Sequence, residues 1–299
     1  MTNDHDINER HSTYDKNHCW QYDIRMNNIE GDIAEAILNG LSKEEIETLK
    51  VPDFTLQFEE KSKILPEIKE FIIRHEWLGR LGLYPTHFFT ARYKGVLAGV
   101  VIMDMPNAFS KILGDNTKKL ERLISRGACV SWSPKNLASS LVSFAIKWMV
   151  KNTDYRLFSA YSDPYAKEIG TIYQACNFYY LGQKSGATCQ YKLDNGRWVS
   201  DRYFRSRSVY KRMAKEHGIA WESEWQDGDK VNFSLMPESV AKMIREYSKE
   251  FMLSCEKREI KPKHKYVYIL GRDRRETRKL KKIFFERNKI YEYPKVRGE

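Results

Sequence analysis

Asp163 and Tyr173, a carboxylate and a phenol, stand ten positions apart in the stretch Ser159–Gly182. Asp163 closes a short apolar run, and Tyr173 belongs to the helix-length segment that comes after it. If this helix folds back on the strand, the two side chains meet in one cleft. The alternative is structural: Asp163 caps the helix and Tyr173 packs, half-buried, against the core, because aspartate is common before helices.

A histidine adds a further group with acid–base chemistry. The apolar spacing of residues 64–77 predicts a helix with His75 near its C-terminal end, just before a glycine-containing exit at 78–82. The imidazole would either satisfy the last carbonyls of that helix or face a cleft as a base or metal ligand.

The elements that must position these groups alternate between strands and helices. Strands are predicted at 54–58, 88–93, 96–103, 128–132, 158–161 and 177–182, and helices at 64–77, at 137–150 and after Pro164. A hairpin followed by two crossovers predicts an α/β core with a mixed sheet. We place this core at 51–200, between an N-terminal extension (1–50) and a basic C-terminal region (201–299) with a helical insertion at 219–260.

Composition indicates an ordinary globular protein, with 41% hydrophobic and 30% charged residues in 299. No apolar run reaches the roughly 18 residues of a membrane span, and the polar N-terminus lacks a signal-peptide pattern, so we expect a cytoplasmic location and no membrane contact. The five cysteines are scattered without short paired spacing, which predicts reduced thiols.

The net charge of +11 is concentrated near the C-terminus. Residues 257–299 carry 16 Lys or Arg against 6 Asp or Glu, and a second basic cluster at 202–215 is interleaved with aromatic residues. Such patches favour a nucleic-acid partner, although a solvated face that keeps the protein soluble is the alternative. The residues predicted to contact nucleic acid are Arg202, Arg205, Arg207, Lys211, Arg212, Arg272, Arg274, Arg275 and Arg278.

Residues 54–193 resemble the GNAT acyltransferase superfamily. The most similar part is Ile169–Gly182, which matches the penultimate helix and strand of that superfamily, with Asn177 in place of the usual glycine. Where an acyl-CoA-binding member has Arg or Gln and a glycine-rich turn, this chain has Ser-Pro-Lys-Asn-Leu-Ala at 133–138. The missing glycines leave the backbone less room to wrap a pyrophosphate, so we do not expect acetyl-CoA to bind in the usual way.

Five motifs in order make the chain more specifically similar to phage-encoded Mom-type DNA-modification proteins. They are His75 in His-Glu-Trp-Leu-Gly, Arg126 in Ser-Arg-Gly-Ala-Cys-Val, Pro134-Lys135-Asn136 with Ser139, Asp163 in Tyr-Ser-Asp-Pro, and Tyr173. The ending, with 266–271 and 293–295, is similar too, whereas 1–50 and 219–260 lie outside the resemblance. Proteins of this kind derivatise the exocyclic amine of adenine, which protects phage DNA from restriction in the host cytoplasm.

The resemblance implies a catalytic group of His75, Asp163 and Tyr173. Transfer onto a nucleobase amine needs a base, which suits Asp163 or His75, and a phenol that donates to a leaving group or an oxyanion, which suits Tyr173. Because Mom-type proteins have been associated with iron, His75 and Asp163 would alternatively ligate a metal.

The resemblance also implies residues that bind the donor and the base. Arg126 would hold an anionic donor or a phosphate, and Ser139 with Asn136 would contact an acyl-CoA-type or other small donor. A base must leave the duplex to react, and Tyr93, Tyr161 or Tyr165 would stack on it.

The leading hypothesis is a phage-type transferase that attaches a small acyl- or amino-acid-derived group to a nucleobase amine of DNA, with adenine favoured. One alternative is an ordinary GNAT N-acyltransferase that acts on a protein, a tRNA or a small amine. Another is a non-catalytic DNA-binding protein with anti-restriction activity. The sequence implies DNA as partner and no particular protein partner.

Overall fold

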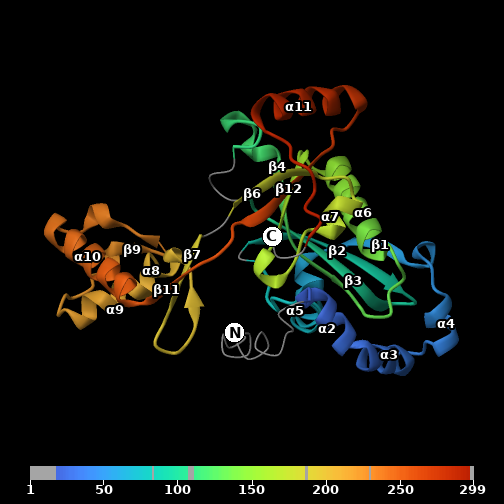
Figure 1. Cartoon of the computed structure of the whole chain (residues 1–299), viewed down its shortest axis with the longest axis horizontal. Coiled ribbons are helices and arrows are strands. Elements are labelled where there is room, and N and C mark those ends of the chain that lie inside the picture. Colours follow the sequence, from blue (N-terminus) through green and yellow to red (C-terminus); the bar gives the residue numbers. More distant parts are fainter. Residues whose placement is uncertain (1–17, 83, 107–110, 186–187, 229, 297–299) are drawn as a thin grey trace. The chain divides into compact units, whose positions relative to one another are not determined.

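The computed structural model describes residues 18–82, 84–106, 111–185, 188–228 and 230–296 (Figure 1). The chain divides into two compact units. One unit combines residues 1–185 with 263–299, and the other consists of residues 186–262. The second unit is therefore an insertion, after which the chain returns to complete the first.

A seven-stranded mixed sheet forms the centre of the first unit, in the order β1-β2-β3-β4-β5-β12-β6. Its strands are β1 (Thr55–Glu59), β2 (Pro85–Tyr93), β3 (Val96–Asp104), β4 (Glu121–Cys129), β5 (Leu157–Ser162), β6 (Tyr179–Ser185) and β12 (Lys263–Ile269). Among these strands, β4 and β5 pair in parallel and the other neighbours pair antiparallel. The predicted mixed α/β core is confirmed, and its sixth position is filled by a strand from beyond the insertion.

Helices cover both sides of this sheet. They are α2 (Trp20–Asn27), α3 (Ile29–Leu38), α4 (Lys43–Thr48), α5 (Lys61–His75), α6 (Leu137–Asn152), α7 (Thr171–Ala175) and α11 (Arg274–Arg287). In β3, every residue from Ala98 to Asp104 is buried, as expected of a strand covered on both faces. α6 turns Leu137, Leu141, Ala145 and Met149 into the core at the four-residue spacing of one helix face.

Three local features are set directly by residue type. Lys94 and Gly95 both have positive φ, 47° and 87°, as the predicted tight hairpin between β2 and β3 requires. Ser42 and Glu45 form the capping box that opens α4. Asn177 comes after α7 with φ 58°, a conformation that asparagine tolerates better than most residues, which explains how it replaces a glycine.

Two predicted elements were wrong in their bounds. The strand predicted at 128–132 is β4, which begins at Glu121 and ends at Cys129. Arg122 and Arg126 interrupt the apolar pattern of this strand in the sequence. In the structure the Arg122 guanidinium lies over the Tyr155 ring, 3.6 Å from its centroid, and Arg126 donates to the Arg80 carbonyl. Secondly, the helix after Pro164 is only the five-residue α7, since Gly170 has φ 67° just before it.

The second unit has its own sheet and its own core. Its elements include β7 (Cys189–Lys192), β8 (Trp198–Val199), α8 (Asp201–Phe204), α9 (Arg207–Glu216), β9 (Gln226–Asp227), β10 (Lys230–Val231), α10 (Glu238–Ser254) and β11 (Glu256–Glu259). β11, β7 and β8 form an antiparallel sheet, and β9 pairs with β10. Tyr210, Trp225 and Ile244 belong to a buried cluster of this unit alone, so it has a separate hydrophobic centre.

No helix among the described residues is both long and apolar enough to cross a membrane. The five cysteines, which were predicted to be reduced thiols, form no disulfide in the structure. Cys129 and Cys176 pack half-buried against the core of the sheet.

Candidate active site

The site begins where the two parallel strands part. β4 pairs with β5 only as far as Ile124 and Ala160, whereas β4 stays paired with β3 to Cys129 and β5 stays paired with β12 to Ser162. Each strand thus stays with its other neighbour beyond this point. Arg126 is the charged residue on the diverging end of β4, and Asp163 directly follows that of β5.

Asp163 is fixed on three sides. Its carboxylate accepts a hydrogen bond from the Tyr165 amide at 3.0 Å and lies 2.9 Å from the Lys263 ammonium at the start of β12. Its own carbonyl accepts the Glu168 amide at 3.1 Å. The side chain keeps 18% of its surface exposed, so it caps a turn and remains accessible at the same time.

Tyr173 stands in α7 with its ring among other aromatics. Its centroid lies 5.4 Å from that of Phe178 and 5.5 Å from that of Tyr266. Burial raises the pKa of the phenol, and the carboxylates of Glu168 and Glu76 raise it further. The phenol therefore keeps its proton at neutral pH and can act as a hydrogen-bond donor or general acid.

The Arg126 side chain is held in place by neighbouring carbonyl groups and a carboxylate. Its side chain donates to the carbonyl of Arg80 at 2.7 Å and to that of Ser125, and its Nε atom lies 4.0 Å from Glu76 Oε2. The guanidinium also acts electrostatically on Tyr173, whose pKa it lowers. Arg126 and Tyr173 therefore interact electrostatically, and Arg126 also meets the carboxylate of Glu76.

Two carboxylates of the site were missed in the sequence. Glu76 is buried, and its Oε2 accepts the amides of Leu78 and Gly79, both at 3.0 Å. Glu168 retains part of its surface and is joined to Asp163 through a short turn. Their signals are weak: Glu76 comes directly after the conspicuous His75, and Glu168 stands in a segment that was predicted to be helix.

Glu168 has the most perturbed carboxyl of the site. Burial raises the pKa of Glu168 to about 8, helped by repulsion from Glu76 and Asp163, while Lys263 opposes the shift. A carboxyl that titrates near neutral pH is suited to proton transfer, because both of its forms are then populated.

His75 points to a different neighbourhood. Its ring is 6% exposed, with Nδ1 3.6 Å from Asp32 Oδ2 of α3 and its centroid 4.3 Å from that of Phe71. Its backbone carbonyl accepts Gln21 from α2. The imidazole therefore lies beside Asp32 of α3 and Phe71 of α5.

Of the other residues predicted to bind the donor or the base, Ser139 and Asn136 lie together at the start of α6, whereas Tyr93 lies in β2. Ser139 stands in the first turn of α6, and its hydroxyl donates to the Asn136 carbonyl at 3.0 Å. The Ser139 carbonyl accepts a hydrogen bond from the thiol of Cys176, the residue after α7. Asn136 precedes α6 with φ 74° and is exposed. The Tyr93 phenol donates to Glu45 of α4, at 3.2 Å.

Tyr165 is the most exposed of the three tyrosines that were predicted to stack on a base. It lies two residues after Asp163, is 49% exposed, and packs edge-on against Trp20 with 5.0 Å between ring centroids. Tyr161 lies in β5, with the Lys265 ammonium 5.8 Å from its ring.

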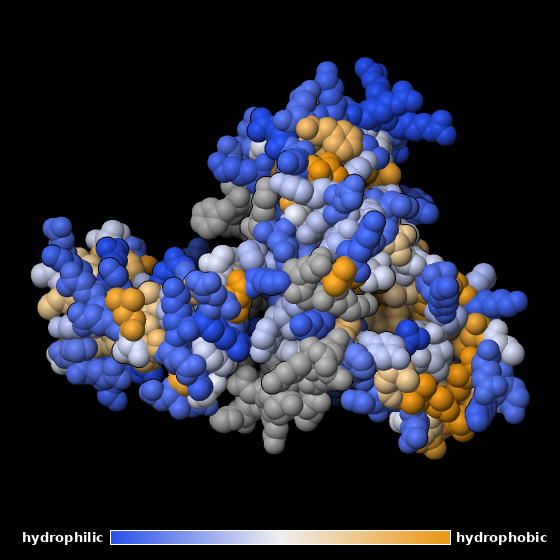
Figure 2. All heavy atoms as spheres, in the orientation of Figure 1, coloured by the Kyte–Doolittle hydropathy of each residue, from blue (hydrophilic) through white to orange (hydrophobic). Residues whose placement is uncertain are grey.

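The predicted nucleic-acid residues fall into both units. Arg202, Arg205, Arg207, Lys211 and Arg212 belong to α8 and α9 of the inserted unit or the residue after α8, whereas Arg272, Arg274, Arg275 and Arg278 belong to α11 or the residues before it. Several have partners: Arg205 pairs with Asp201, Arg207 donates to the Gly228 carbonyl, and Arg212 lies over Phe251. Arg274, Arg275 and Arg278 are exposed on α11, where hydrophilic side chains gather (Figure 2).

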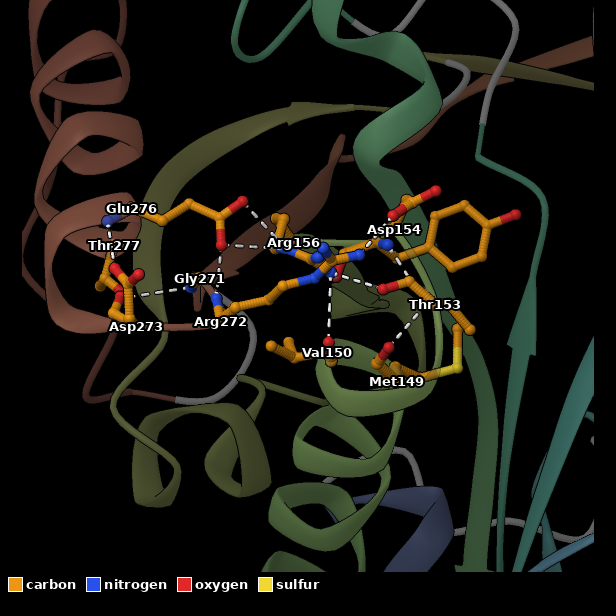
Figure 3. A network of polar contacts seen from close by, with 11 residues as sticks. Met149, Val150, Thr153, Asp154, Arg156, Gly271, Arg272, Asp273, Glu276 and Thr277 are labelled. Atoms are coloured by element: carbon orange, nitrogen blue, oxygen red, sulfur yellow. Dashed lines mark hydrogen bonds and ion pairs between the residues drawn. The ribbon is translucent and has the colours of Figure 1, made fainter.

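A buried arginine outside the prediction anchors α11. Arg156, 2% exposed, donates to both carboxylate oxygens of Glu276 at 3.1 and 3.2 Å and to the carbonyls of Thr153 and Tyr155 at 2.7 Å each (Figure 3). Asp273 caps the helix by accepting the Glu276 amide at 2.7 Å. The apolar side of α11 packs through Leu280 and Phe284. This leaves its basic side exposed and rigidly supported.

The metal hypothesis gains no support from the geometry. Over the ranges that the structure describes, no three His, Cys, Asp or Glu side chains are grouped so that they could hold a metal ion. His75 and Asp163, the two ligands that the sequence suggested, have the separate surroundings given above.

The first unit has the mixed sheet, with one parallel pair of strands that part, that the resemblance to GNAT proteins predicts. A model described as the Mom protein family matches residues 68–295, which is more than half of the chain. The chain belongs to the Mom protein family. No curated protein matches its sequence.

Similar solved structures include acetyltransferases of low identity. A putative acetyltransferase from Salmonella typhimurium, solved with its cofactor acetyl-CoA, is 13% identical, with 48% of this chain and 88% of that chain covered and a TM-score of 0.34. The ribosomal L7/L12 alpha-N-protein acetyltransferase RimL is 13% identical, with 74% and 96% covered and a TM-score of 0.35. A GNAT family acetyltransferase from Elizabethkingia anophelis with acetyl-CoA bound is 11% identical, with 73% and 99% covered and a TM-score of 0.32.

Proposed function

We propose that this protein modifies DNA, by transferring a small acyl- or amino-acid-derived group to the exocyclic amine of a nucleobase, with adenine favoured. One observation supports the proposal: in a chain of the Mom family, Glu168 and Arg126 both act electrostatically on Tyr173, and Asp163 acts on Glu168. The same site supports acyl transfer in general, and the nucleobase is the proposed acceptor.

The chemistry needs a base, because an exocyclic amine on a nucleobase is a poor nucleophile. As the amine nitrogen attacks the donor carbonyl, a new N–C bond forms and the bond to the leaving group breaks. Glu168, with a pKa of about 8, takes the proton that the nitrogen loses. Asp163, held by Lys263, accepts a hydrogen bond from the amine and so orients it.

Tyr173 stabilises the negative charge that develops on the donor during the reaction. Negative charge develops on the carbonyl oxygen and then on the leaving group, and a phenol that keeps its proton stabilises the first and protonates the second. The exposed ring of Tyr165 offers a stacking surface for a base that has left the duplex. No step requires His75 or a metal.

In this proposal, DNA is held by positive charge on elements other than those that carry the chemistry. Arg274, Arg275 and Arg278 lie exposed on a helix that Arg156 anchors to the core unit. The cluster on α8 and α9 adds a further basic surface on the inserted unit. Restriction protection results if the modified base no longer fits the endonuclease.

Nucleoside analysis tests the proposal directly. DNA from cells that express the wild-type protein, in the native phage background, is digested and its nucleosides are separated by mass spectrometry. We expect a mass-shifted nucleoside, which is absent when Glu168→Gln or Tyr173→Phe replaces the wild type. Unmodified nucleosides alone, with folded wild-type protein present, would contradict it. Turnover of free amines without DNA would instead support an ordinary N-acyltransferase.

A further inference from the structure

The turn between β4 and α6 is the place where the glycine-rich sequence of an acyl-CoA-binding GNAT would stand. Three of its backbone amides donate to partners within the protein. The Ser131 amide donates to Asp32 Oδ2 at 2.8 Å, the Ser133 amide to the Val130 carbonyl at 3.2 Å, and the Leu137 amide to the Pro134 carbonyl at 3.2 Å. Pro134 itself has no amide hydrogen.

Asp32 places a negative charge on this turn. The residue belongs to α3, and its carboxylate is buried, with 1% of the side chain exposed. Besides the Ser131 amide, it binds the Arg74 guanidinium at 2.8 Å through Oδ1. An amide and an arginine are the groups with which proteins hold phosphate oxygens, and here a carboxylate of the chain takes both.

Arg25 of α2 closes the turn from the same side. Its guanidinium donates to the Ser131 carbonyl at 3.1 and 2.9 Å and to the Ser133 carbonyl at 3.0 Å. Its positive charge is thus directed at backbone carbonyls. Lys135 is exposed in the turn, and no ion pair is shown for it among the described residues.

The helices α2 and α3 are themselves tied to the C-terminal end of α5 and to the residues just after that helix. Gln21 donates to the His75 carbonyl at 2.6 Å and accepts the Trp77 amide at 3.1 Å, and Asn28 donates to the Arg74 carbonyl at 2.8 Å. These hydrogen bonds fix α2 and the start of α3 against the end of α5, and α3 carries the Asp32 side chain that binds the turn.

We infer that the α2–α3 segment closes this turn to diphosphates, with Asp32 in the position of a phosphate group, so that the donor is a small molecule without a diphosphate contact here. A diphosphate would compete with Asp32 for the Ser131 amide, and it would meet a buried carboxylate of like charge. The acyl-CoA cradle therefore does not fit these residues. The inference rests on the proposed transferase for the identity of the reaction, but not for the binding properties of the turn.

Calorimetric titration tests this without any catalytic assay. Acetyl-CoA and inorganic pyrophosphate are titrated into the full-length wild-type protein, and we expect no saturable binding up to about 1 mM of either. Asp32→Asn keeps the shape of the side chain and removes its charge, so pyrophosphate affinity should rise by about tenfold or more over the wild type. Saturable micromolar binding of acetyl-CoA to the wild type would overturn the inference.

Glu35→Gln is the matched control. Glu35 also pairs with Arg74, but its side chain is 56% exposed and it has no bond to the turn. We expect this variant to behave like the wild type, whereas an equal gain in both variants would show that Asp32 is not what excludes the anion. Circular dichroism reports whether Asp32→Asn folds, and the wild-type titration decides the inference if it does not.

The titration and the nucleoside analysis distinguish failure of this inference from failure of the proposed function. A wild type that modifies DNA and binds acetyl-CoA overturns only the inference about the donor. A wild type that binds no acetyl-CoA and leaves DNA unmodified contradicts only the proposed function.

Discussion

The Lys263 ammonium lies 2.9 Å from the Asp163 carboxylate, although the inserted unit separates the two residues in the sequence. Lys263 also lowers the pKa of Glu168. Replacing it by Met should therefore raise that pKa further and shift the acidic limb of the pH–rate profile to higher pH. The profile of DNA modification against pH measures this, and Lys263→Arg should stay close to the wild type. An unchanged limb in Lys263→Met would show that Glu168 is not the base.

The raised pKa of Glu168 makes a second prediction, about stability. Its folded value, about 8, lies above the ordinary value of 4.5, so the folded protein binds this proton more tightly than the unfolded chain. The carboxyl consequently lowers the free energy of unfolding as pH rises from about 4.5 to about 8, by on the order of a few kcal/mol. Glu168→Gln removes this term: it should match the wild type near pH 4 and exceed it at pH 9, while activity falls.

Urea unfolding at several pH values measures this difference. Glu70→Gln, at an exposed position of α5, is the control and should show no such pH-dependent gain. A Glu168→Gln variant that is less stable than the wild type at pH 9 would mean that the ionised carboxylate is well stabilised in the folded protein.

Tyr173→Phe separates chemistry from packing. The ring contacts with Phe178 and Tyr266 do not need the hydroxyl, so the fold should survive. Loss of a general acid should lower the rate of modification by about 10²- to 10⁴-fold. Single-turnover measurements with saturating DNA check this. A variant with wild-type rates would return Tyr173 to a purely structural role.

Much of the core was predictable because it depends on local pattern. The hairpin turn at Lys94–Gly95, the capping box at Ser42 and the apolar face of α6 are each set by residues close in sequence. The place of β12 between β5 and β6 was not predictable. Its pairing with these strands joins segments that the 77-residue insertion separates in the sequence, and no local signal encodes that pairing.

The site was predictable in part for the same reason. Asp163, Tyr173 and Arg126 were predicted from residue types and motifs; in the structure Arg126 and Glu168 act electrostatically on Tyr173, and Asp163 acts on Glu168. Glu168 was missed because its importance comes from burial beside other carboxylates, which no spacing reveals. His75 was expected in the same group, but its side chain direction depends on how α3 packs against α5.

Gly170 should be essential for the position of α7. Its φ of 67° is unfavourable for residues with a side chain, and an added Cβ would come within 2.4 Å of the Tyr266 ring. Gly170→Ala combines both effects and should lower the free energy of unfolding by about 2–5 kcal/mol. Gly95→Ala, at φ 87° with no atom within 4 Å of the added Cβ, carries only the backbone strain. Equal losses in the two variants, by urea unfolding, would show that the Tyr266 contact relaxes.

The exposed face of α11 supplies the last prediction. Replacing Arg274, Arg275 and Arg278 by Gln removes three positive charges without touching Leu280 or Phe284, the residues that pack the helix. If all three contact phosphates, DNA affinity falls for every sequence alike, and the slope of log affinity against log salt decreases in magnitude by about 2.7. Fluorescence anisotropy at several salt concentrations measures both. The control removes equal charge at Lys43, Lys69 and Lys147, which are exposed on α4, α5 and α6, and should leave the slope nearly unchanged. The same change in both variants would mean that net charge, and not this helix, attracts DNA.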